Sequence, residues 1–132
     1  MSERDKTCAE RIASELDDRI RTEAAQVIRD LYQLAEQYNR TNSSDDRDNL
    51  RGAILSVDPE DDGDESLLLA YGGPTEWVHL HQDGTGSYHY TYAPDGRWQE
   101  RTCALTPTQV RDAAKVATLY RIAERDAEQI GV

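Results

Sequence analysis

The sequence predicts an α+β fold: a four- to five-stranded antiparallel β-meander with a long N-terminal helix and a C-terminal helix packed on one face. Three features support this prediction: helical periodicity at the start, an alternating middle rich in glycine and tyrosine, and a helix-start signal near the end. The 132 residues suffice for one domain with a modest core. We expect a single domain, 1–132, with a helix at 7–40, an antiparallel sheet at 50–105 and a helix at 107–129.

The first helix is predicted from apolar residues spaced by three and four, with no glycine or proline among them. They are Ile12, Leu16, Ile20, Ala24, Val27, Leu31, Leu34 and Tyr38. Such a stripe is typical of an amphipathic helix that covers a sheet. A homodimer seam is the alternative, although Ala24 and Tyr38 make a poor heptad.

Acidic residues dominate the segment that follows this helix. The formal net charge is −11, and residues 41–65 hold nine acids against two arginines. The acids are Asp45, Asp46, Asp48, Asp58, Glu60, Asp61, Asp62, Asp64 and Glu65. We expect a loop at 42–46, a first strand at 50–57 and an acidic hairpin turn at 58–66. In a calcium loop beginning at Asp58, Leu69 would replace the required twelfth-position Glu, so we expect a solvated turn.

The charge also restricts the class of partner. Nucleic acids and anionic membranes bind basic surfaces, so direct binding to either is not expected. The longest apolar run is short and the N-terminus is charged, so no membrane span or signal peptide is expected and the cytoplasm is the default location. Cys8 and Cys103 are too few for a disulfide framework, and we expect two free thiols.

The next strands are bounded by turn residues. A strand at 66–71 ends at Gly72-Gly73-Pro74, and strands at 76–82 and 87–92 flank the turn at 83–86. With two or four loop residues, His81 faces Tyr88, His79 faces Tyr90 and Trp77 faces Tyr92. The last strand, 97–104, follows Ala93-Pro94-Asp95-Gly96.

This register gathers aromatic side chains on one strand face, as in surfaces that bind protein partners. The gathered residues are Trp77, Tyr88, Tyr90 and Tyr92. The pair His79-x-His81 is typical of zinc sites, which need a third ligand. The favoured register puts His89 on the opposite face, whereas a three-residue loop would unite the three histidines. We therefore expect no metal and no cofactor.

Catalytic motifs are missing from the sequence, which has no Gly-x-Ser-x-Gly, His-Glu-x-x-His or Cys-x-x-Cys. Neighbouring strands would bring Glu76 and Glu100 near a histidine, but a chain this acidic produces such pairs by chance. An enzyme is not expected. The final helix begins with Thr106 as N-cap, Pro107 at the first position and Gln109 completing a capping box.

The sequence combines a leucine-rich strand, running from Leu67 into Gly72-Gly73-Pro74, with Trp77, Trp98 and a helix from Pro107. This combination resembles small uncharacterised proteins of bacteriophages and mobile elements. The resemblance implies a setting, a small accessory protein, and transfers no functional residue.

Three functions are expected, in this order. The first is a non-enzymatic acidic protein that inhibits a nucleic-acid-binding host defence protein, of anti-CRISPR or anti-restriction type, through the acidic segment. The second is a structural or regulatory domain that self-associates or binds a host partner through the helix stripe or the aromatic face. The third is a metal-dependent enzyme built on His79, His81 and His89.

Overall fold

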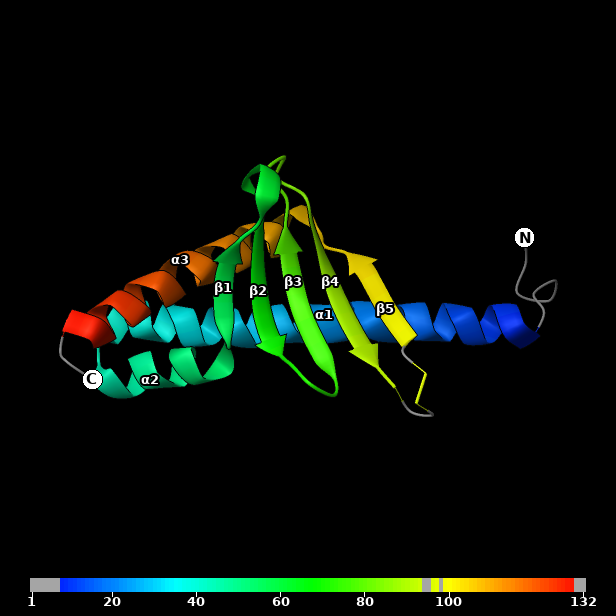
Figure 1. The fold of residues 1–132 in the computed structure, drawn as a ribbon, viewed down its shortest axis with the longest axis horizontal. Coiled ribbons are helices and arrows are strands. Elements are labelled where there is room, and N and C mark those ends of the chain that lie inside the picture. The colour runs from blue at the N-terminus through cyan, green and yellow to red at the C-terminus, as the bar shows by residue number, and fades with distance from the viewer. Residues whose placement is uncertain (1–7, 94–95, 98, 130–132) are drawn as a thin grey trace.

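The computed structural model describes residues 8–93, 96–97 and 99–129, with side chains described from Asp17 onward. The helices are α1 (Cys8–Thr41), α2 (Ser44–Ala53) and α3 (Pro107–Gln129), with a 3₁₀ turn η2 (Asp61–Gly63). The strands are β1 (Ser56–Pro59), β2 (Glu65–Ala70), β3 (Thr75–Leu80), β4 (Gly86–Tyr92) and β5 (Gln99–Ala104). The strands form one antiparallel sheet in the order β1-β2-β3-β4-β5 (Figure 1). The predicted α+β meander is confirmed.

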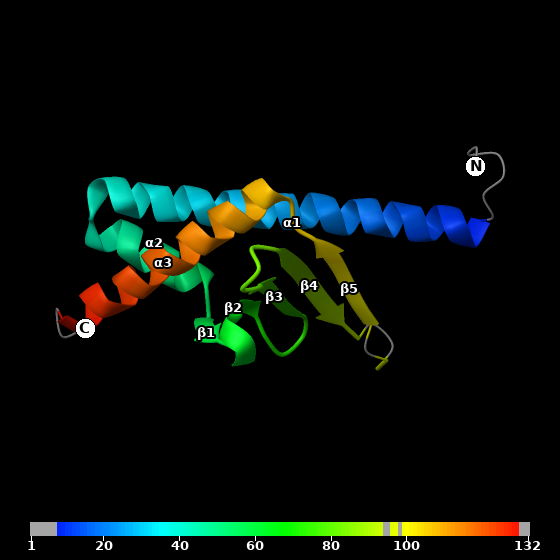
Figure 2. The ribbon, with the colours of Figure 1, turned by 90° about the horizontal axis from the view of Figure 1, so that it is seen from above.

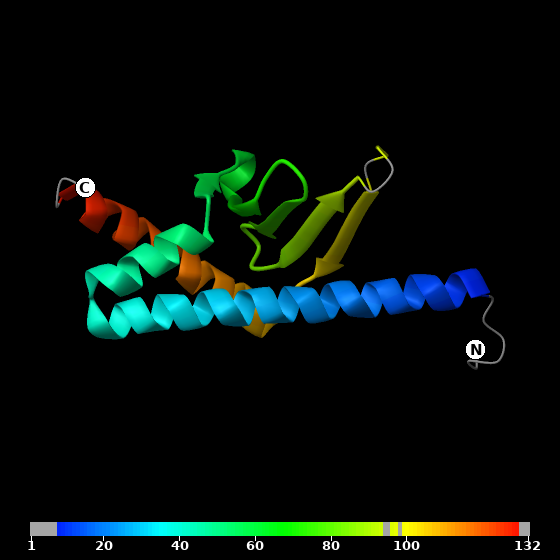
Figure 3. The ribbon, with the colours of Figure 1, turned by 90° about the horizontal axis from the view of Figure 1, so that it is seen from below.

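The helices of the described chain lie on one side of the sheet, as the views from above and below show (Figures 2 and 3). α3 crosses behind the strands, α1 runs beside α3 and continues past β5, and α2 folds back along α1 (Figure 1). Side chains from every helix meet those of the sheet in one core. The largest fully buried side chains are Tyr88, Leu50, Leu67, Val78 and Val116.

The predicted stripe of α1 faces this core where its side chains are described. Ile20, Ala24, Leu31 and Tyr38 are buried, and Val27 and Leu34 are half-buried. Ile12 and Leu16 lie outside the described side chains. The Tyr38 hydroxyl also donates a 2.5 Å hydrogen bond to Asp126 of α3. From Ile20 onward the stripe is occupied within the monomer, so this part of it is not a free homodimer seam.

The segment after α1 differs from the prediction. Residues 44–53 form α2 where a loop at 42–46 and the start of a strand were expected, and β1 begins only at Ser56. Ser43 is the N-cap, and its hydroxyl accepts a hydrogen bond from the Asp46 N–H. Leu50 is fully buried. The cap and the packing of Leu50 and Ala53 against the core favour helix in place of the start of the strand expected at 50–57.

The β3–β4 hairpin has a different register from the one expected. Trp77 pairs with His89, Val78 with Tyr88 and His79 with Ser87. The loop is Gln82-Asp83-Gly84, closed by the His81 N–H donating to the Thr85 carbonyl at 2.8 Å. Gly84 has φ of +90°, the left-handed residue of a three-residue hairpin loop. The predicted turn was centred too far along the chain, so the pairing His81–Tyr88 is wrong.

Other local predictions are confirmed. The Thr106 hydroxyl accepts a hydrogen bond from the Gln109 N–H at 3.2 Å, and the Gln109 side chain accepts one from the Thr106 N–H at 2.9 Å, which completes the capping box of α3. The acidic turn joins β1 to β2 as a hairpin. Residues 94 and 95 of the last predicted turn, and Trp98 of the resemblance, lie outside the described residues.

Candidate functional site

One face of the sheet is not covered by any helix of the described chain (Figure 2). Because strand side chains alternate, the burial of Val78, Leu80 and Tyr88 against the helices sends their neighbours to the other side. We call that side the open face. Its central residues are Ser66, Leu68, Trp77, His79, Ser87, His89, Glu100 and Thr102, all paired in register across β2 to β5.

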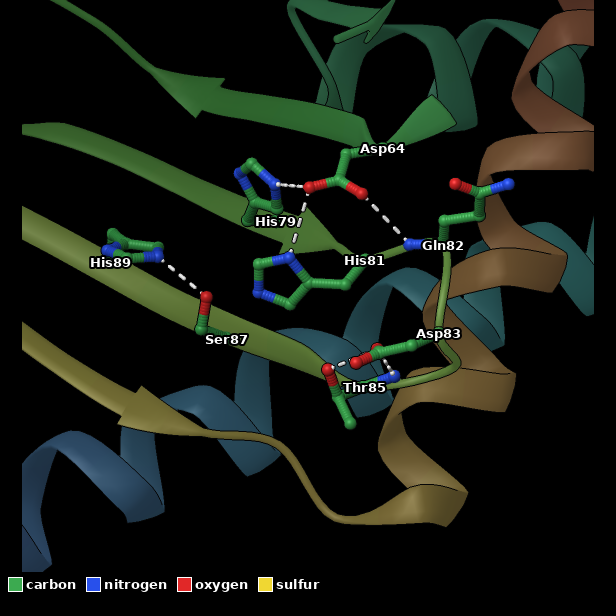
Figure 4. Close-up of polar contacts among 8 residues, drawn as sticks. All are labelled: Asp64, His79, His81, Gln82, Asp83, Thr85, Ser87 and His89. Atoms are coloured by element: carbon green, nitrogen blue, oxygen red, sulfur yellow. Dashed lines mark hydrogen bonds and ion pairs between the residues drawn. The ribbon is translucent and has the colours of Figure 1, made fainter. Parts of the chain in front are cut away.

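Three side chains of metal-ligand type converge at one end of the open face (Figure 4). Asp64 Oδ2 lies 2.9 Å from His79 Nε2 and 3.1 Å from His81 Nδ1. These ligand atoms all lie within 4.8 Å of one another. The side chains of Asp64 and His79 are 21% and 25% exposed, and that of His81 is 42% exposed. The cluster therefore borders solvent while its carboxylate is largely enclosed.

The backbone fixes Asp64 in this position. Its N–H donates to the Asp61 carbonyl at 3.4 Å and its carbonyl accepts from the Glu60 N–H at 2.8 Å, so it closes the η2 turn. Its other oxygen, Oδ1, accepts from the Gln82 N–H at 2.9 Å. Hydrogen bonds from His79, from this N–H and from His81 lower the pKa of Asp64 to about 2. The carboxylate is therefore ionised at neutral pH and held with one oxygen toward both rings.

His89 belongs to a second group on the open face, apart from the Asp64 cluster. Its ring stacks on Trp77 with centroids 4.7 Å apart and planes 3° from parallel. Nε2 lies 2.7 Å from Ser87 Oγ and Nδ1 lies 3.2 Å from Glu100 Oε1. The three histidines thus share one face of the sheet. The favoured register placed His89 on the opposite face, and that assignment is wrong.

The chain Ser87–His89–Glu100 has the connectivity of nucleophile, base and orienting carboxylate. Ser87, however, lies within β4, which is paired on both sides with β3 and β5. Backbone N–H groups in such a ladder are engaged with neighbouring strands and are not directed at a developing oxyanion. Glu76 and Glu100 lie on opposite faces, because Glu76 is on the helix-covered face and accepts a hydrogen bond from the Tyr88 hydroxyl, so they do not form the carboxylate pair considered from the sequence.

The predicted aromatic face is divided between the two sides of the sheet. Trp77 is on the open face, whereas Tyr88 is 0% exposed in the core and Tyr90 packs against the core beside Tyr92, ring centroids 5.9 Å apart. Burial, followed by the hydrogen bond to Glu76, raises the pKa of Tyr88. The register error moved the tyrosines to the wrong face, and Tyr88 has no surface to offer a partner.

The nine predicted acidic residues are also divided. Asp45, Asp46 and Asp48 lie on α2, whereas the rest lie at the opposite end of β1, in and around η2 (Figure 1). The second group is Asp58, Glu60, Asp61, Asp62, Asp64 and Glu65; we call it the acidic turn. A shallow pocket lined by Asp62, Asp64, His81, Gln82, Asp83 and Thr85 joins this turn to the β3–β4 loop. Glu65 pairs with Arg121 of α3.

At the other end of the open face, a shallow groove is lined by Tyr71, Gly72, Thr75, Trp77, Thr91, Gln99 and Glu100. Tyr71 is 79% exposed, which is unusual for a side chain of its size. It follows β2 and precedes the cis Gly73–Pro74 peptide. Tyr71 was missed from the sequence, and Asp64 was predicted as one of the acidic residues but not as a neighbour of His79 and His81. The sequence did hold a signal for this contact: a turn centred between Gly72 and Gly73 pairs the two flanking strands so that Asp64 lies opposite His81.

Comparison with known proteins identified no relative of this chain. No family model matches it, and neither curated proteins nor solved structures gave a significant match. Within the described residues, none of the helices combines the length and the apolar character that crossing a membrane requires.

Proposed function

We propose that this chain is a non-enzymatic binding protein whose open face docks on a basic protein surface. The observation that carries the proposal is the half-buried Trp77–His89 stack on a sheet face that no described helix covers. Tryptophan at the centre of a surface flanked by polar groups is the commonest anchor of protein interfaces. Tyr71, largely exposed at the edge of the same face, extends the apolar surface.

Charge selects the class of partner. The acidic turn places carboxylates beside one end of the open face, apart from Glu65, which pairs with Arg121 of α3, and the chain carries a net charge of −11. Charge complementarity across an interface accelerates association with a basic partner and disfavours acidic ones. A basic groove that ordinarily holds nucleic acid has this character. The specific form we propose is an inhibitor carried by a mobile element, acting in the host cytoplasm on a nucleic-acid-binding defence protein.

The division of the acids narrows this proposal. A single acidic face mimicking DNA would need α2 and the acidic turn together, but they lie at opposite ends of β1. On α2, Arg47 and Arg51 also lie 3.5 Å and 3.9 Å from Asp48 and offset its charge. We therefore assign the electrostatic role to the acidic turn at one end of the open face, and the anchoring role to Trp77 and Tyr71 towards the other end.

The test compares four variants, two with single aromatic substitutions and two with double charge substitutions. The chain, freed of nucleic acid by nuclease, captures its partner from a source-cell lysate, and the purified partner is then titrated calorimetrically. Trp77→Ala should weaken binding by about 30-fold or more, since an interface anchor contributes about 2 kcal/mol or more. Tyr71→Ala, at an exposed position, gives a second reading that cannot be ascribed to unfolding.

Charge is tested with a matched pair of double variants. Glu60→Gln with Asp61→Asn should weaken binding at low salt and flatten its salt dependence. Asp45→Asn with Asp48→Asn removes the same charge from α2 and should leave both unchanged. Equal binding by the wild type, the Trp77 variant and the acidic-turn variant would overturn the proposal, as would an equal loss in the α2 control.

A further inference from the structure

We propose that Asp64, His79 and His81 form a binding site for a divalent transition-metal ion, with zinc preferred and one coordination position open. The inference does not depend on the proposed function, because it concerns the isolated chain. It rests on two imidazole nitrogens directed at one carboxylate oxygen, 2.9 Å and 3.1 Å away (Figure 4).

The spacing matches what a small metal ion requires. In a tetrahedral zinc site with bonds of about 2.0–2.1 Å, ligand atoms lie about 3.3 Å from one another. The two contacts to Asp64 Oδ2 are 2.9 Å and 3.1 Å, and the whole set lies within 4.8 Å. Small rotations of the exposed His81 ring would bring the set to coordination distance. The ion would take the place of the two hydrogens that the rings direct at the carboxylate.

The surroundings supply the supports that metal ligands usually have. Ligating carboxylates are commonly oriented by a hydrogen bond to the oxygen that does not bind, and the Gln82 N–H at 2.9 Å from Oδ1 does this for Asp64. The histidines alternate on β3, a strand paired on both sides, so their spacing is set by the sheet. Asp64 is held in the connection between β1 and β2, on the neighbouring hairpin. The frame is therefore fixed before any ion arrives.

The ligand set selects the kind of metal. Two imidazoles and one carboxylate suit zinc and its neighbours, whereas calcium and magnesium favour oxygen ligands throughout. Nearby Asp83 is not one of the residues whose ligand atoms converge; its Oδ1 accepts from the Thr85 N–H at 2.9 Å and hydroxyl at 2.6 Å. Three protein ligands at a solvent-bordering position leave the fourth place for water or for a donor from another molecule.

The experiment is a zinc titration of the metal-free, tag-free chain by calorimetry at pH 7.5. We expect one equivalent to bind, and cobalt to give a visible spectrum with nitrogen–oxygen ligation. Asp64→Asn and His81→Ala should each weaken zinc binding by about 100-fold or more, since even outer-shell changes cost about 10–100-fold. Millimolar calcium or magnesium should not compete.

His89→Gln is the matched control, since it removes a histidine of the same face that does not touch the cluster. It should bind zinc as the wild type does. Absence of zinc binding by the folded wild type at 100-fold excess would overturn the proposal. So would equal losses in the His81 and His89 variants, which would indicate diffuse surface binding. Partner capture plays no part, so failure here leaves the docking proposal standing.

Discussion

Replacing Gly86 by alanine tests the β3–β4 register more directly than any other single change. A Cβ on Gly86 would lie 3.0 Å from the His79 carbonyl oxygen and 3.2 Å from both Leu105 Cδ1 and Val110 Cγ2. The first contact is with backbone of the neighbouring strand, and the others are with side chains at and just before the start of α3. None of these groups is the free end of a long, flexible side chain, so the structure must shift to admit the methyl group.

The expected cost follows from measured overpacking of well-packed interiors, which is about 1–3 kcal/mol. With a urea m-value of about 1.5 kcal/mol per molar, a loss of about 2 kcal/mol lowers the denaturation midpoint by roughly 1.3 M. In the register expected from sequence, Gly86 would lie in the turn, where surface substitutions cost within about 0.5 kcal/mol. The two registers therefore predict clearly different midpoints.

Gly52→Ala is the matched control for this measurement. Gly52 is exposed in α2, and a Cβ there would meet nothing within 4 Å. Alanine in a helix interior is favoured over glycine by about 0.5–1 kcal/mol, so this variant should raise the midpoint. Urea denaturation followed by circular dichroism measures both. An unchanged midpoint for Gly86→Ala would refute the hairpin geometry, and a lowered midpoint for Gly52→Ala would refute α2.

Three further predictions concern single side chains. Thr106→Ala removes the N-cap of α3 and should cost about 1 kcal/mol in urea denaturation, whereas exposed Thr108→Ala should cost little. Hydrogen bonds from Thr41 and Ser43 lower the pKa of Asp46, so its contribution to stability is present above the ordinary carboxyl pKa of about 3.9 and is lost as pH falls through the lowered value. The stability difference between wild type and Asp46→Asn should therefore shrink between pH 6 and pH 3; a constant difference would contradict it. Burial raises the pKa of the Cys103 thiol. In a Cys8→Ser background, Cys103 should therefore react with a thiol reagent at pH 8 more slowly than free cysteine does. An equal rate would show that the thiol is accessible to solvent and would contradict this prediction.

Local signals account for what the sequence predicts well. The capping box at Thr106 and Gln109 satisfies backbone groups within four residues, so no distant contact decides where α3 begins. The stripe of α1 from Ile20 to Tyr38 is equally local in its spacing. Such signals also sufficed for the α+β class and the meander order.

The errors arose where a distant contact decides between local alternatives. Both Gly84 and Gly86 are turn formers in the sequence, and packing of α3 residue Val110 against Gly86 assigns the turn to Gly84. Likewise, burial of Leu50 in the core favours helix at the start of the segment 50–57, where a strand was expected. Once the register moves, Tyr88, Tyr90 and Tyr92 exchange faces with His89. The cluster of Asp64, His79 and His81 depends on Asp64 from a second hairpin, which the His-x-His motif alone could not reveal.

The two ends of the sheet limit how another chain can approach it. β1 has four residues and ends in Pro59, which has no N–H to donate. At the other end, β5 begins with Gln99, Glu100 and Arg101, and α1 packs beside it. Short length, proline and charge are the devices that prevent strand-by-strand growth into fibres. A partner that extends the sheet is therefore disfavoured at both margins, and recognition is directed to side chains that stand perpendicular to the strands.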